Sequence, residues 1–423
     1  MNWNVKKIWP AAAVSIAAFT AMLNADQYQN RSRNYKDRDR SPDMHCQRIS
    51  ICGPDMPMAV NPSVHPFTDE ACCCDVGEYL LTVAGFYWQA AEDGLEFGVE
   101  SKVVAPTAAA TTVSAASLID AHYLSPEFKW KPGFKIGLGY YTTHDGWDVN
   151  LLWTHYNGRA TKSVDDESDT NVTLLPLWSA FGPATDAGGT ILWASQANTS
   201  LRIDLNLYDL ELGREFYTSK MLTLRPHIGF RGATIYQKYE IDYLGGIWDG
   251  SPSLLTGGPF TNEVNMKNRF YGGGVRAGLD TNWWFGCCPL DACPSNWGFF
   301  GNLALSLIYG KFKVEHKEFN QSPLAVTGFA KTPILETDEN FHSVRAMLDL
   351  ALGIEWLSLF RDSNYGIQFQ LAWEFHQFFN QNQLWRVNRI GDSSTTVHGE
   401  NVFAQSRGDL STQGVTLTAK FTF

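Results

Sequence analysis

Residues 415–423 read V-T-L-T-A-K-F-T-F and end the chain. Every odd-numbered residue of this stretch is apolar, and every even-numbered residue is polar. Side chains of a β-strand point alternately to opposite faces, so the stretch predicts a strand with one apolar and one polar face. A soluble sheet buries its apolar face, whereas a membrane barrel turns that face towards lipid. The rest of the chain has to distinguish these two arrangements.

The same alternation recurs between residues 77 and 423, with turn residues between the alternating segments. In residues 344–356 every even-numbered residue is apolar, whereas Arg345, Asp349 and Glu355 occupy odd positions. Aromatic residues gather near the ends of such segments, which is typical of the girdles of a membrane barrel. In residues 201–212 the apolar positions change parity after Leu207, which predicts a β-bulge there.

The connections between these segments alternate in length. Short connections are predicted at 144–146, 217–221, 286–296 and 361–364, and long ones at about 105–126, 157–198, 244–266, 320–339 and 380–410. This predicts an all-β fold, a transmembrane antiparallel up-and-down β-barrel of about ten strands over residues 77–423. About twelve strands is the alternative, if Asp93-Gly94 forms a hairpin turn or if 157–198 contains a further pair. Outer-membrane barrels have short periplasmic turns and long outer loops, so we expect the carboxy terminus in the periplasm.

Residues 1–25 are predicted to be a secretory signal peptide. Lys6 and Lys7 precede a mostly apolar stretch at 8–23, and Ala25 supplies a small residue for cleavage. A first transmembrane helix is the alternative, but the stretch is short and a polar segment follows it directly. No later uninterrupted run of about 18 apolar residues occurs, which argues against a helical membrane protein. The net charge of −11 argues against nucleic acid as a partner.

Residues 26–76 are predicted to be a disordered periplasmic arm, because 27–43 mixes charges with almost nothing apolar. The chain has eight cysteines, and an exported chain is expected to oxidise them. Adjacent cysteines pair poorly with each other, so we expect disulfides between clusters or between molecules. A zinc site is the alternative, although the paired C-x-x-C spacing of zinc sites is missing. The disulfide candidates are Cys46, Cys52, Cys72, Cys73, Cys74, Cys287, Cys288 and Cys293.

Several segments resemble the Legionella-type major outer membrane protein family, which also occurs in chlamydia-like bacteria. They are F-Y-W-Q-A-A-E-D-G-L-E-F (86–97), F-K-W-K-P-G-F-K-I-G-L-G-Y (128–140), H-D-G-W-D-V (144–149), L-E-L-G-R-E-F-Y (210–217), L-T-L-R-P-H-I-G-F-R-G-A (222–233) and V-R-A-G-L-D-T (275–281). The resemblance covers roughly residues 79–423. It implies a β-barrel porin in the outer membrane of a Gram-negative-type bacterium, with disulfide-linked assemblies in relatives. It supplies no catalytic residues and no cofactor.

The expected function is therefore passive diffusion of small hydrophilic solutes and ions through a mixed-charge lumen. The predicted pore-lining residues are Lys131, Lys135, Asp148, Arg202, Asp204, Arg225, Arg231, Arg276, Asp280, Arg345, Asp349, Glu355 and Glu374. The alternative for each of them is a structural salt bridge that fills a narrow barrel. Since both signs of charge are present, we expect weak ion selectivity.

Two other functions remain open from the sequence. The first is a structural or adhesive surface barrel with a plugged lumen, stiffened by disulfide cross-links. The second is a hydrolase, for which His144-Asp145 and the pair His376 and Glu374 are the candidates. Expected partners are outer-membrane lipid, further copies of the chain, disulfide-linked envelope proteins and the barrel-assembly machinery. In such barrels this machinery reads the aromatic residues that end the last strand, here Phe421 and Phe423.

Overall fold

The computed structural model describes residues 77–101, 120–142, 146–165, 173–178, 191–219, 221–244, 247–248, 261–285, 297–321, 331–360, 365–390 and 400–423. The predicted signal peptide, the predicted arm, all eight cysteines and the pair at 144–145 lie outside these residues. Within the described part of the chain, no helix is long and apolar enough to cross a membrane.

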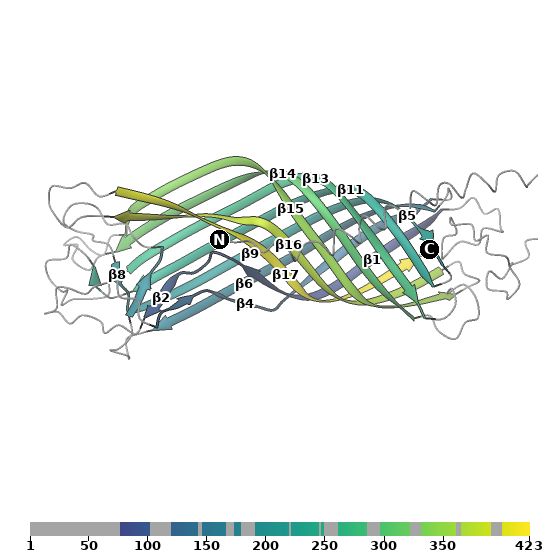
Figure 1. Ribbon diagram of the computed structural model, residues 1–423, viewed down its shortest axis with the longest axis horizontal. Helices are drawn as coiled ribbons and strands as arrows, with labels where there is room; N and C mark the ends of the chain where they lie inside the picture. Colours follow the sequence, from purple (N-terminus) through teal and green to yellow (C-terminus); the bar gives the residue numbers. More distant parts are fainter. Residues whose placement is uncertain are drawn as a thin grey trace, which may run out of the picture. The chain divides into compact units, whose positions relative to one another are not determined.

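Ten long strands form a closed barrel, as the connection lengths predict (Figure 1). They are β1 (Glu78–Glu92), β5 (Lys131–Tyr141), β6 (Trp147–Asp165), β9 (Gln196–Arg214), β11 (Leu222–Leu244), β13 (Thr261–Trp284), β14 (Trp297–Gln321), β15 (Thr332–Phe360), β16 (Tyr365–Ile390) and β17 (Glu400–Thr422). Each strand pairs antiparallel with the next in this order. The pairing of β1 with β17 closes the ring, with Leu80 opposite Thr422.

The remaining strands are short. The short strand β4 (Glu127–Lys129) continues β5 along β6, and β10 (Phe216–Tyr217) continues β9 along β11. At the end opposite the carboxy terminus are β2 (Gly98–Ser101), β3 (His122–Leu124), β7 (Thr173–Pro176), β8 (Ile191–Trp193) and β12 (Ile247–Trp248). Figure 1 labels β2 and β8 at this end. We call it the loop end, because the long connections lie there, and the opposite end the turn end.

The wall has its apolar side chains outside and its charged side chains inside. On β15, Leu350 and Leu352 are 38% and 71% exposed, whereas Asp349 and Glu355 are 8% and 0% exposed. On β16, Phe369 is 43% exposed and Glu374 is 8% exposed. A soluble sandwich would show the opposite polarity, because water would surround its outer face. The inverted arrangement predicted from the sequence is therefore confirmed.

The strands are longer than a membrane requires. The strands β13 to β17 have 23–29 residues, whereas a tilted transmembrane strand needs about 9–11. They also extend into ranges predicted as loops: β6 continues to Asp165, β16 to Ile390, and β17 already begins at Glu400. The predicted loop ranges 157–198 and 380–410 were therefore too wide, as were 244–266, where β13 begins at Thr261, and 320–339, where β15 begins at Thr332. Beyond the membrane the outer face of a strand meets water in place of lipid and its apolar alternation weakens. The sequence pattern therefore ends before the strand does.

The predicted β-bulge near Leu207 is wrong. The pairing of β9 with both β6 and β11 is continuous through this residue. Leu201 and Leu207 face the interior and are buried, whereas Tyr208 is 46% exposed. The parity change arises because the strand passes from an apolar exterior at the turn end to an apolar interior at the loop end.

The interior of the loop end is a hydrophobic core. Trp88, Tyr156, Trp178, Phe270 and Phe312 are completely buried in it. The rings of Phe86 and Trp88 stack with their centroids 3.6 Å apart. This core lies beyond the charged part of the lumen and closes the barrel interior with packed side chains.

Candidate pore interior

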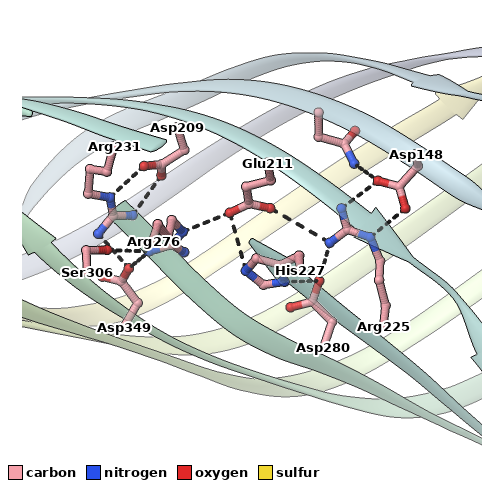
Figure 2. Close-up of polar contacts among 11 residues, drawn as sticks. Asp148, Asp209, Glu211, Arg225, His227, Arg231, Arg276, Asp280, Ser306 and Asp349 are labelled. Carbon is pink, nitrogen blue, oxygen red and sulfur yellow. Dashed lines mark hydrogen bonds and ion pairs between the residues drawn. The ribbon is translucent and has the colours of Figure 1, made fainter. Parts of the chain in front are cut away.

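Arginine side chains of β11 form ion pairs with acids of other strands inside the barrel. The guanidinium of Arg225 donates two hydrogen bonds to Asp148 on β6, at 2.8 and 2.6 Å (Figure 2). It also donates to Asp280 on β13 at 2.6 Å. His227, two residues along β11, lies 3.6 Å from both Glu211 and Asp280. This spacing of two places all of these side chains on the same inward face.

A second group of ion pairs continues towards the loop end. Arg231 donates to both oxygens of Asp209, at 2.5 and 2.7 Å, and reaches Asp349 at 2.6 Å. Arg276 donates to Glu211 at 2.8 Å and also to Asp349. Figure 2 shows the two groups joined through Glu211 into one chain of alternating charge. Bidentate pairs of this kind fix the orientation of both side chains and also stabilise the fold.

A glycine makes the Arg276 contact with Glu211 possible. Gly229 on β11 lies between them in the sheet register, opposite Glu211 on one side and Arg276 on the other. A Cβ atom at Gly229 would lie 1.9 Å from the carbonyl oxygen of Leu210. The backbones therefore approach closely here, and the inward face is left clear for Arg276 to cross β11.

The opposite wall carries a third polar group. Lys135 on β5 donates to Glu374 on β16 at 2.8 Å, and the hydroxyl of Thr416 donates to the same carboxylate at 2.6 Å. His376 Nδ1 lies 2.7 Å from Asp349, and its ring packs 4.7 Å from that of Trp88. His376 is thus part of the same buried network as the arginines, and Glu374, proposed as its catalytic partner, is bonded to Lys135.

These groups surround a cavity of about 240 Å³. Its lining includes Lys135, Arg225, Arg276, Asp280 and Glu374, which come from β5, β11, β13 and β16. Charges of both signs therefore face the same enclosed space at the level where the outer wall is apolar. Such a space favours water and small polar solutes over apolar ones.

A chain segment closes the lumen on the loop-end side of this cavity. After β1, residues 93–97 leave the wall at Gly94, whose φ of +80° suits glycine. We call residues 93–97 the strap. Leu95 and Phe97 of the strap are 2% and 0% exposed and belong to the hydrophobic core. Asp93-Gly94 is therefore a departure into the lumen and not a hairpin turn, which excludes that route to twelve strands.

The strap is held by hydrogen bonds from side chains. Each of its five carbonyl oxygens accepts at least one, and that of Glu96 accepts two. The donors are Asn382 to Asp93 at 2.8 Å, Ser406 to Gly94 at 2.7 Å, Tyr239 to Leu95 at 2.6 Å, Trp178 and Arg386 to Glu96 at 2.8 and 2.9 Å, and Tyr243 to Phe97 at 2.5 Å. Most of these donors belong to β11, β16 and β17. A buried backbone carbonyl without a partner is costly, so these side chains specify where the strap lies.

The structure places most predicted pore-lining residues on the inner side of the wall. Asp148, Arg225, Arg231, Arg276, Asp280, Asp349, Glu355 and Glu374 belong to buried polar contacts there, as does Lys135. Lys131 is half-buried opposite the inward-facing Trp88. Arg345 lies with its guanidinium 5.0 Å from the ring of the buried Phe312.

The prediction that Arg202 and Asp204 line the pore is wrong. They face outwards on β9, because their neighbours Leu201, Ile203 and Leu205 are fully buried. The apolar residues of this segment pack in the core at the loop end, not against lipid. The predicted pore-lining residues did not include Asp209, Glu211 and His227, although all three alternate with exposed apolar residues on their strands, and the alternation places His227 on the same face as Arg225 and Arg231.

The closed ring, the apolar exterior and the charged interior define a transmembrane β-barrel. The chain belongs to the family described as Legionella pneumophila major outer membrane protein precursor, whose model matches residues 72–423. The protein is therefore an outer-membrane protein.

No curated protein matches the chain. Among solved structures, a deltaS2S3 mutant of the TodX monoaromatic hydrocarbon channel shares 8% identity over 86% of this chain and 92% of that chain, with a TM-score of 0.27. The Pseudomonas putida toluene transporter TodX shares 8% identity over 86% and 91%, with a TM-score of 0.22.

Proposed function

We propose that the barrel is a channel for passive diffusion of small hydrophilic solutes and ions. The observation that carries this proposal is the charged cavity of about 240 Å³ inside the lipid-facing part of the wall. Arg225 of β11 and Arg276 of β13, both in its lining, form ion pairs with carboxylates of β6, β9 and β15. Opposed charges produce a transverse field that orients polar solutes and disfavours apolar ones. Because both signs line the same space, the channel discriminates weakly between anions and cations.

The strap is the constriction of this channel. Solutes that enter at the turn end reach the charged cavity first, and the strap with its core then blocks the direct path to the loop end. Conduction therefore depends on displacement of the strap, or on narrow water paths beside it. We expect a small unitary conductance with long closed periods.

A planar lipid bilayer tests the proposal. Purified protein is added to one side, and current is recorded at fixed voltage in a salt gradient. Stepwise conductance with a reversal potential close to zero supports a weakly selective channel. A bilayer that stays silent, with barrel refolding shown by heat-dependent gel mobility, contradicts the proposal.

The strap also favours a second candidate function, a surface barrel with a permanently closed lumen. In that case the protein would contribute to envelope architecture, and disulfides formed by its cysteines would stiffen the envelope. Persistent silence in the bilayer, together with reductant-sensitive cross-linked species in isolated envelopes, would favour this second function. Neither proposal includes a catalytic step.

A further inference from the structure

Three neighbouring strands carry basic residues directly beyond the apolar part of their outer face. On β11, β13 and β14 the apolar outer positions end at a tyrosine on the loop-end side: Tyr236, Tyr271 and Tyr309. The next charged outward residue on each strand is basic. We call these residues the basic row: Lys238, Lys267, Arg269, Lys311 and Lys313.

The basic row has fewer counter-ions than charges. Glu315 lies 3.1 Å from Lys313, and 3.7 and 3.8 Å from Lys267 and Arg269, so one carboxylate serves three cations. Lys238 lies 2.5 Å from Glu240. No ion pair involves Lys311 in the part of the chain that the structure describes. Five cations held close together with two carboxylates repel one another, and an anionic partner removes that cost.

Charge changes sign farther from the apolar band. The outward residues beyond the row are mainly acidic, and some of them pair with lysines: Glu240, Asp242, Glu263, Glu336 and Asp338. At the opposite edge of the band, β13 and β14 instead carry the exposed aromatic residues Trp283 and Trp297. The five cations of the basic row thus lie together at one edge of the band, and cations farther out, such as Lys317 and Lys331, are paired with acids there. A charge pattern that served solubility alone would not be layered in this way.

We propose that the basic row binds the phosphate groups of a glycolipid in the leaflet around the loop end. Outer-membrane barrels keep their short turns in the periplasm, so the loop end lies in the outer leaflet. Phosphates of a lipid headgroup lie directly above the hydrocarbon, which is the depth of the row. Arg269 suits bidentate phosphate binding, and the lysines supply point charges around it.

The neighbouring surface identifies the phosphate as part of a lipid. The apolar residues of the same strands lie beyond Tyr271 and Tyr309 on the turn-end side of the row, where acyl chains attached to the phosphorylated headgroup would pack: Val275, Leu305 and Leu307 are about half exposed there. A free phosphate would gain only the charge contacts. The inference rests on the position of the barrel in the outer membrane and is independent of whether the lumen conducts.

Native mass spectrometry of the full chain in detergent tests the proposal. The probes are bis-phosphorylated lipid A, the same lipid with both phosphates removed, and inorganic phosphate as a competitor. The test variant is Lys311→Gln/Lys313→Gln. The matched control is Lys317→Gln/Lys331→Gln, which removes the same charge from lysines paired with Glu336 and Glu263 outside the row.

We expect the unmodified protein to bind the phosphorylated lipid at least tenfold more tightly than the dephosphorylated one. The test variant should lose roughly 25-fold in affinity for the phosphorylated lipid only, because each of the two surface cations contributes about fivefold. The control variant should bind as the unmodified protein does. Equal binding of the two lipids overturns the proposal, as does equal weakening in both variants. Full displacement by millimolar inorganic phosphate would also overturn it, because it would show that the lipid part is not recognised.

Discussion

Two tyrosines of β11 that hold the strap provide the most direct test of whether the strap gates the lumen. Tyr239 and Tyr243 donate hydrogen bonds from β11 to the carbonyl oxygens of Leu95 and Phe97, at 2.6 and 2.5 Å. Replacing both with phenylalanine removes the two hydroxyls and keeps the rings in the core. We expect the strap to leave its closed position more often in Tyr239→Phe/Tyr243→Phe.

The magnitude follows from the hydrogen bonds that are lost. A buried hydrogen bond contributes about 1 kcal/mol net, so the double variant destabilises the seated strap by about 2 kcal/mol. That corresponds to a roughly 30-fold rise in the ratio of displaced to seated strap. The carbonyl oxygen of Leu95 can bond to water only when the strap is displaced, which acts in the same direction, whereas that of Phe97 keeps the backbone N–H of Leu177 at 3.1 Å.

Single-channel recording in planar bilayers measures this ratio as the open probability at fixed voltage. The control is Tyr271→Phe/Tyr309→Phe, which makes the same chemical change at tyrosines that are 54% and 61% exposed on the outer face. The unmodified protein and this control should have the same open probability. If the strap variant folds, as heat-dependent gel mobility reports, and its open probability and conductance equal those of the control, the strap is not the gate.

Three further predictions concern the wall and its lining. Arg276→Met leaves Glu211 and Asp349 without one of their buried partners and should lower the free energy of unfolding by about 3–5 kcal/mol, measured by urea titration in detergent. The control Lys317→Met should have no measurable effect. Equal effects of the two variants would refute the stabilising role of the network. Lys135→Gln removes a cation beside Glu374 in the cavity, so the reversal potential in a salt gradient should move towards cation selectivity; an unchanged value would place conduction elsewhere. Leu352→Arg puts a charge on the lipid face and should reduce folding stability in lipid vesicles by about 2–4 kcal/mol, and a variant as stable as the parent would mean that this position faces water.

The sequence predicts the wall well where one strand keeps one environment. Along β15 and β16 the same parity is apolar outside and polar inside, so Asp349, Glu355 and Glu374 were assigned to the correct face from alternation alone. The closing strand β17 behaves in the same way, with Thr416 inside and Leu417 55% exposed. Because each strand contributes an independent pattern, the strand count of ten also followed from the sequence.

The failures share one physical cause. On β9, Leu201 and Leu210 are both apolar, but one packs in the core and the other lies on the outer face. Hydrophobicity alone does not say which medium an apolar side chain meets, so Arg202 was assigned to the lumen. The strap was missed for a related reason: its donors, such as Asn382 and Ser406, are about 300 residues away along the chain. The signal peptide, the arm and the disulfides remain predictions.

The exchange of polarity along β14 has a consequence for the depth at which the barrel sits in its bilayer. On β14 the outer face changes from Leu307 and Tyr309 to Lys311 within a few residues, while the inner face changes from Ser306 to Ile308 and Phe312. Sliding the barrel deeper would carry ammonium groups into hydrocarbon, and raising it would expose oily residues to water. Both displacements cost free energy at the same boundary, so the wall itself fixes the depth at which the barrel lies in the bilayer.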